Sequence, residues 1–334
     1  MTTMSTPPAA EPEQAGPELL IEQHWTAKDS PVVRACVAAV AEHGPAFRSV
    51  AHYSHGVLDF AVRPRGSAPL RTPRTVSGRL LAAEGWPGRH LVVCVEDFDR
   101  ALQRLETGEL MRLVVEAPDG GMYCARIRAG QHLVGVTQSG DTVAELDDGL
   151  NLLVTRIRRE VHHLPDELLG GDGKLVPAEP AGTGELHWEA ALSAGGPGSP
   201  ASLRSVWDDH VNAVNLQYAA YYRDWTAVCA GDAFDDPDLG VRLGSIPSGE
   251  RRAMYRDLAG RLRADITRLR QILRPVSDQQ IRRLVLDVQE GAVYIHWFGH
   301  GPGTFLLGVT VDQPQVALAE ERLGSLLTAV SGRS

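Results

Sequence analysis

Apolar and polar residues alternate along 112–161 in a way that predicts a compact structural unit. The runs RLVVEA, MYCARIR and HLVGVTQ each favour a β-strand, and PDGG between the first two predicts a tight hairpin turn. The next stretch, TVAELDDGLNLLVTRIRREV, carries apolar residues at steps of three and four, which predicts an amphipathic helix. We therefore expect three antiparallel strands followed by a helix that covers their sheet.

The same pattern returns at 283–330. RLVLDV, VYIHWFG and FLLGVTV predict three strands, QEGA predicts the turn, and Val316, Ala319, Leu323, Leu326 and Val330 predict the helix. With an offset of 171 residues, Leu113, Val114, Gly120 and Tyr123 align with Leu284, Val285, Gly291 and Tyr294. After a two-residue insertion, Leu133, Gly135 and Leu150 align with Leu306, Gly308 and Leu323. A repeat of this length indicates a duplicated structural unit.

Upstream of the first copy the sequence predicts a helix and then strands. Ser30 is a suitable N-cap for a helix over 30–43, and strands are expected at 46–54 and 57–64. The stretch 91–110 combines a strand-like run, LVVCV, with a short helix. The predicted order of the first half is thus α-β-β-α-β-β-β-α.

Upstream of the second copy the sequence predicts the same order. A long helix is expected over 202–225, followed by weak strands at 226–231 and 240–245. A further helix over 248–273 has a regular apolar face, and Pro275 marks its end.

These elements predict an α+β protein made of two tandem α/β sandwiches, each a mixed-to-antiparallel sheet covered by helices. The proposed organisation is a disordered tail at 1–18, a first domain at 19–164, a Gly/Pro-rich linker at 165–200 and a second domain at 201–334. The run LHWEAAL inside the linker could dock on a neighbouring domain.

The repeated unit resembles the roadblock/LC7 domain family, which has a profilin-like architecture. The resemblance rests on RLVLDVQEGAVYIHWFGHGPGTFLLGVTVDQPQVALAEERLGSLLTAV and on its partner at 112–161, where two strands, a Gly-containing turn, a third strand and a covering helix follow one another. The upstream elements match the family in order only. The chain would therefore carry two tandem roadblock-like domains.

This resemblance implies a non-catalytic adaptor or regulator. Roadblock domains dimerise by extending one sheet across the dimer, and they bind small GTPases or anchor signalling complexes. The expected partners are thus proteins, and the two copies could form an intramolecular pseudo-dimer or a homodimer. Two other interpretations stay open. One is a small-molecule-sensing module, as in PAS and GAF sandwiches, and the other is an enzyme with a site between the two halves.

Composition narrows these alternatives. The net charge of −9 argues against a nucleic-acid-coating protein. The first 18 residues do not have the pattern of a signal peptide, and no apolar run is long enough to span a membrane, so we expect a cytoplasmic protein. The four cysteines form no CxxC pair and are expected to be buried, without a disulfide framework or a zinc site.

No catalytic, cofactor or metal site is predicted. His52 and His55 form HxxH and His296 and His300 form HxxxH, but strand geometry separates such residues, so they are expected to be surface or interface histidines. The loop GDAFDDPD lacks the spacing of an EF-hand and is expected to be a solvated acidic turn. Neither a phosphate-binding GxxxxGK[ST] loop nor a GxSxG elbow occurs.

The remaining candidate is a charged helix face. Along 249–274 eight arginines stand against three acidic residues, and Arg256, Arg263 and Arg270 recur every seven residues, so they share one stripe. On an acidic chain such a stripe could dock an acidic partner or the acidic face of the other half. The alternative is a solvated helix face with ion pairs to its neighbours.

Overall fold

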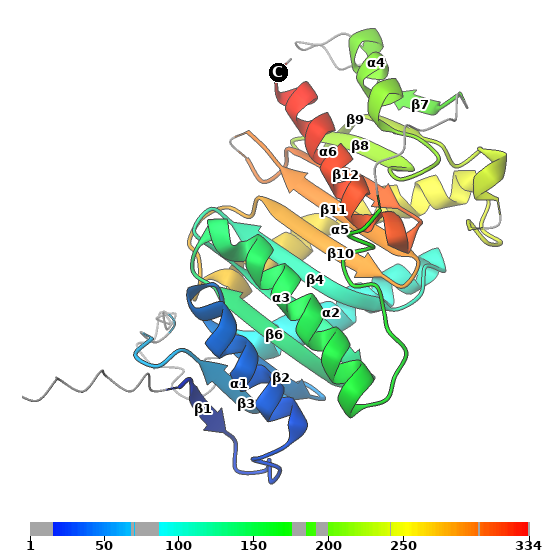
Figure 1. The fold of residues 1–334 in the computed structure, drawn as a ribbon. Helices are drawn as coiled ribbons and strands as arrows, with labels where there is room; N and C mark the ends of the chain where they lie inside the picture. The colour runs from blue at the N-terminus through cyan, green and yellow to red at the C-terminus, as the bar shows by residue number, and fades with distance from the viewer. Residues whose placement is uncertain are drawn as a thin grey trace, which may run out of the picture.

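A computed structural model describes residues 16–67, 70, 87–175, 185–191, 200–240, 242–299 and 301–332. The fold is α+β, as predicted, but it contains one continuous sheet of twelve strands where the sequence predicted two tandem sandwiches (Figure 1). The strand order is β1-β3-β2-β6-β5-β4-β10-β11-β12-β8-β9-β7, and each pairing is antiparallel.

The first half has the predicted order of elements. They are α1 (Pro31–His43), β2 (Ser49–Ser54), β3 (Val57–Arg63), α2 (Gly88–Leu102), β4 (Leu110–Ala117), β5 (Gly120–Arg128), β6 (Gln131–Thr137) and α3 (Val143–Arg156). The Ser30 side chain caps α1 by accepting a hydrogen bond from the Val33 N–H. A short edge strand, β1 (Glu18–Ile21), precedes them.

The second half repeats this order. Its elements are α4 (Pro200–His210), β8 (Tyr218–Arg223), β9 (Thr226–Asp232), α5 (Ser248–Leu273), β10 (Arg283–Val288), β11 (Gly291–Trp297), β12 (Phe305–Thr310) and α6 (Val316–Ser331). The LHWEAAL run supplies β7 (His187–Ala190), which pairs with β9 at the far edge of the sheet.

Three stretches differ from the prediction. The whole LVVCV run lies in helix α2, because Leu91, Val95 and Phe98 are buried at helical spacing. The predicted helix over 202–225 ends at His210 and gives way to β8. Asn212 ends it, because its side-chain oxygen accepts the backbone N–H groups of Val214 and Asn215. The weak strand expected at 240–245 is also absent from the described residues there, which form turns.

The two halves meet at β4 and β10, which pair antiparallel in the middle of the sheet. Val114 lies opposite Val285 in this register, and these two residues are equivalent in the repeat because 285 − 114 = 171. The junction is therefore pseudo-twofold, with its axis at this valine pair. Away from the axis, Arg112 faces Asp287, the equivalent of Glu116, and Glu116 faces Arg283, the equivalent of Arg112.

Helices cover both faces of the sheet. Helices α1, α3, α4 and α6 lie on one face and α2 and α5 on the other (Figure 1). Glycines let α3 and α6 approach their strands closely. A Cβ atom at Gly135 would lie 2.1 Å from Leu150, and one at Gly308 would lie 2.8 Å from Leu323. Both copies of the repeat thus keep the glycine against which the covering helix packs. Among the described helices, none is long and apolar enough to cross a membrane.

Candidate functional site

A groove of about 720 Å³ lies between α3 and α6, above the β4–β10 junction. Its floor and walls contain four pairs of residues that are equivalent in the repeat, namely Arg112/Arg283, Ala144/Ala317, Asp147/Glu320 and Asp148/Glu321. The groove therefore follows the pseudo-twofold axis, and each half of the chain contributes one of its sides.

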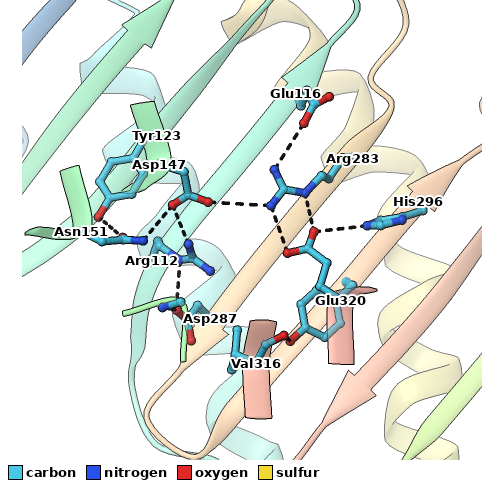
Figure 2. Close-up of polar contacts among 12 residues, drawn as sticks. Arg112, Glu116, Tyr123, Asp147, Asn151, Arg283, Asp287, His296, Val316 and Glu320 are labelled. Atoms are coloured by element: carbon cyan, nitrogen blue, oxygen red, sulfur yellow. Dashed lines mark hydrogen bonds and ion pairs between the residues drawn. The ribbon is translucent and has the colours of Figure 1, made fainter. Parts of the chain in front are cut away.

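Arg112 is the centre of the first set of contacts in the groove (Figure 2). Its Nη1 donates to Asp147 Oδ1 at 2.5 Å, and its Nε donates to Asp287 Oδ2 at 3.0 Å. Asn151 also donates to Asp147, at 3.1 Å, and accepts a hydrogen bond from the Tyr123 hydroxyl. The guanidinium thus joins helix α3 of its own half to strand β10 of the other half.

Arg283 makes the matching contacts from the other side (Figure 2). Its Nε and Nη2 donate to the two carboxylate oxygens of Glu320, the second at 3.0 Å, and its Nη1 donates to Glu116 at 3.3 Å. The imidazole of His296 lies 3.4 Å from Glu320. Arg283 also lies 3.7 Å from Asp147, which links the two sets of contacts.

The residues that contact Arg112 and Arg283 stand at equivalent positions of the repeat. Arg112 and Arg283 differ by 171 positions, as do Glu116 and Asp287, while Asp147 and Glu320 differ by 173 after the insertion. Each arginine bonds the acid of its own C-terminal helix and the acid of the opposite strand. These contacts hold the two halves together in a specific register, which is the best-attested role of buried ion pairs.

Burial and pairing set the protonation of this network. Burial raises the pKa of Asp287 to about 6, although the Arg112 guanidinium opposes the shift. Glu320 is buried as well, but there the interactions with Arg283 and His296 outweigh the effect of burial and hold its pKa far below the usual value of 4.5. Attraction to Asp147 and Asp287 outweighs burial for Arg112 and raises its pKa.

A segment of the predicted linker, residues 168–173, covers one side of the groove, and we call it the strap. The Gly170 N–H donates to Asp287 Oδ2 at 2.8 Å, and the Asp172 N–H donates to the Pro314 carbonyl at 3.0 Å. Gly170 and Gly171 have φ values of +81° and +85°, which favour glycine. The strap seals Asp287, which is 0% exposed.

The predicted arginine stripe lies on α5, on the opposite face of the sheet. All three of its members are exposed. Arg256 pairs with Glu189 of β7 at 2.6 Å, and the Arg263 guanidinium lies 5.9 Å from the Trp225 ring centre. Arg270 lines a separate hollow of about 490 Å³ near the end of α5. The structure therefore places the stripe and the groove on different faces.

The other residues considered from the sequence have structural roles. His52 is buried, not on the surface, and its Nδ1 lies 2.7 Å from Asp59 Oδ2. His300 lies outside the described residues. The acidic loop is not simply solvated, because Arg252 bonds both Asp232 and Asp235. In the described part of the chain no group of three or more His, Cys, Asp or Glu residues is placed to hold a metal ion.

Sequence reasoning missed the groove residues, although a signal for them was present. Arg112 and Arg283 are charged residues inside otherwise apolar strands at equivalent positions of both copies. An acidic residue also follows each of them four positions later, on the same strand face. Comparing the polar positions of the two copies, as well as the apolar ones, would have predicted this network.

The fold and the groove together define an α+β protein with two related halves joined through a buried polar centre. No protein-family model matches the chain, and no curated protein matches it.

Proposed function

We propose that this protein is a non-catalytic cytoplasmic adaptor, built from two roadblock-like domains, that binds a protein partner. The observation that carries the proposal is the outer surface of α5. Five arginines of this helix are exposed, Arg256, Arg261, Arg263, Arg270 and Arg274, against two exposed acids, Glu250 and Asp257. A small GTPase or another signalling protein with an acidic surface is the class of partner we propose.

The charge of the chain makes this face unusual. The protein carries a net charge of −9, so a helix with a local positive excess is complementary to acidic surfaces that the rest of the chain repels. Arg261, Arg263, Arg270 and Arg274 form no ion pair with any described residue. Their charges are therefore available to a partner.

The groove gives little support to catalysis. Asp287, whose pKa burial raises to about 6, is sealed beneath the strap and does not line the groove. Burial and the neighbouring Asp147 also raise the pKa of Asp148, which does line the groove, but no nucleophile has been placed beside it among the described residues. Burial also raises the pKa of the Cys36, Cys94 and Cys229 thiols to about 12, which keeps them protonated and poorly nucleophilic. The groove-lining arginines and acids that we have described instead stabilise the junction.

A ligand-sensing module is the second candidate, and the groove volume is the observation that favours it. A space of about 720 Å³ lies in the usual range for small-molecule sites. A sensed ligand would contact both halves at once and could alter their packing. This candidate predicts a ligand-dependent rise in the thermal unfolding temperature.

Charge reversal on α5 tests the adaptor function. In affinity purification with quantitative mass spectrometry, Arg263→Glu combined with Arg270→Glu should lose at least about 90% of a partner recovered with the wild type, because each reversal replaces attraction by repulsion. Arg34→Glu is the matched control, since Arg34 is exposed on α1, on the other face of the sheet. Equal recovery with both variants would contradict the proposal.

A further inference from the structure

The groove has equivalent residues on its two sides, but the strap covers only one of them. On the covered side Arg112 is 3% exposed and Asp287 0% exposed. On the other side their equivalents, Arg283 and Glu116, are 20% and 25% exposed. The second side is thus an open copy of a site that the chain fills on the first side with its own backbone.

The covered side shows what kind of group fits. The strap contacts the site through main chain, because the Gly170 N–H donates to Asp287 at 2.8 Å. A Cβ atom at Gly170 would lie 3.1 Å from Asn151 Nδ2 and 3.2 Å from Arg112 Nη1, so a side chain there would be crowded. The strap forms a turn here, in which the Gly171 N–H donates to the Leu168 carbonyl at 2.9 Å, so the site accepts a glycine-containing turn lying close to the strand ends.

We propose that the open side, around Glu116 and Arg283, docks a basic, glycine-containing segment of the protein partner in the way that the strap occupies the covered side. A backbone N–H of that segment donates to Glu116, as Gly170 donates to Asp287. The Glu116 Oε1 atom has no hydrogen-bond partner among the described residues, so it is free to accept. This inference rests on the proposed adaptor function, because the segment belongs to the partner.

Charge determines the composition of the segment. Five acids line the groove, Glu116, Asp147, Asp148, Glu320 and Glu321, and only two arginines oppose them. Arg112 and Arg283 are already paired, which leaves a negative excess toward Asp148 and Glu321 at the rim. Lysine or arginine side chains in the segment would meet complementary charge.

The rim also offers apolar contact. Leu152 lines the groove and is 72% exposed, whereas Leu169 of the strap also lines the groove but is buried. Ala144 and Ala317 line the groove on both sides, and their small side chains take up little of its space. The segment we infer therefore combines glycine, an apolar residue and flanking basic residues.

A pair of synthetic peptides tests this inference on the full chain. The first probe is an end-blocked, fluorescein-labelled hexapeptide, Arg-Leu-Leu-Gly-Gly-Arg, and the second replaces both arginines with glutamate. By fluorescence anisotropy at low salt, the basic peptide should bind at least about tenfold more tightly than the acidic one. Glu116→Ala should weaken its binding by about tenfold, because it removes both the charge and the acceptor.

Glu42→Ala is the matched control, because Glu42 is exposed on α1, outside the groove. Circular dichroism and thermal unfolding confirm that each variant is folded. Equal binding of the two peptides, unchanged binding to the Glu116→Ala variant, or no binding at millimolar concentration would each overturn the inference. If the peptide fails while reversal of Arg263 and Arg270 still abolishes partner recovery, the docking site is wrong and the adaptor function stands.

Discussion

At the scale of single residues, the most informative group is Asp287. It is fully buried, one oxygen accepts from Arg112 and Gly170, and the other has no hydrogen-bond partner among the described residues. Burial raises its pKa from 3.8 to about 6 in spite of Arg112. The folded protein thus binds a proton here at pH values where the unfolded chain has already lost it.

This raised pKa has a definite effect on stability. Because the folded state holds the proton more tightly, the contribution of Asp287 to the free energy of unfolding falls as the pH rises from about 4 to about 6. Asp287→Asn removes that contribution. The stability of the wild type minus that of the variant should fall by on the order of 3 kcal/mol between pH 4 and pH 7, measured by urea unfolding. Parallel pH profiles would show that Asp287 keeps its ordinary pKa in the folded protein.

At the scale of elements, the boundary between α4 and β8 shows how a few polar atoms override a helical pattern. Asn212 is buried, accepts two backbone N–H groups at 2.8 and 3.0 Å, and donates to Asn215 at 3.0 Å. These bonds replace the next helical turn, and the following residues enter the sheet as β8. The helix can end there because the turn supplies acceptors for the N–H groups that no longer bond within a helix, namely those of Asn212, Val214, Asn215 and Leu216.

Asn212→Ala should therefore destabilise the protein by about 1–3 kcal/mol, since buried N–H groups would lose their acceptor. Asp209→Ala, an exposed change on α4, should stay within about 0.5 kcal/mol of the wild type. Chemical unfolding followed by tryptophan fluorescence measures both, because Trp207 lies in the same helix. A cost at Asn212 no larger than that at Asp209 would contradict this account of the helix end.

At this scale, the elements marked by a regular apolar pattern could be predicted from the sequence, and those fixed by tertiary contacts could not. The repeated strands and their covering helices were predictable, because the strands are apolar runs buried on both faces and the helices have one apolar face. The start of the second half was not, since β8 lies within the predicted helix and the described residues of 240–245 form turns. The LVVCV run was not, since five adjacent apolar residues fit a buried strand and a buried helix equally well. The groove was missed because Arg112, Asp147 and Asp287 are 35 and 175 positions apart in their pairings and come together only through the fold.

At the scale of the whole molecule, the β4–β10 junction makes the two halves one cooperative structure. Arg112 is bonded across it to Asp287, and Arg283 is bonded across it to Glu116. Removing one partner of such a buried pair leaves the other charge uncompensated. A substitution that destabilises the junction should therefore lower the stability of both halves of the sheet.

Arg112→Met tests this cooperativity, because it leaves Asp147 and Asp287 buried without their common partner. It should cost about 3–5 kcal/mol of stability. Hydrogen exchange should lose protection to the same extent in β6 of the first half and β12 of the second. Arg159→Met, an exposed change, is the control. Loss of protection confined to β6 would show that the halves unfold independently.

The uncovered side of the groove has a further consequence. In a symmetric homodimer each substitution is made twice, so two equivalent sites cannot acquire different ligands. In one chain the two sites can acquire different residues. At equivalent positions of the repeat, the first half has Asn151 where the second has Gly324, and Ala125 where the second has His296. On one side the residues hold the strap that connects the halves, and on the other side their equivalents make no such contact with any described residue, so the two sets are under different structural constraints.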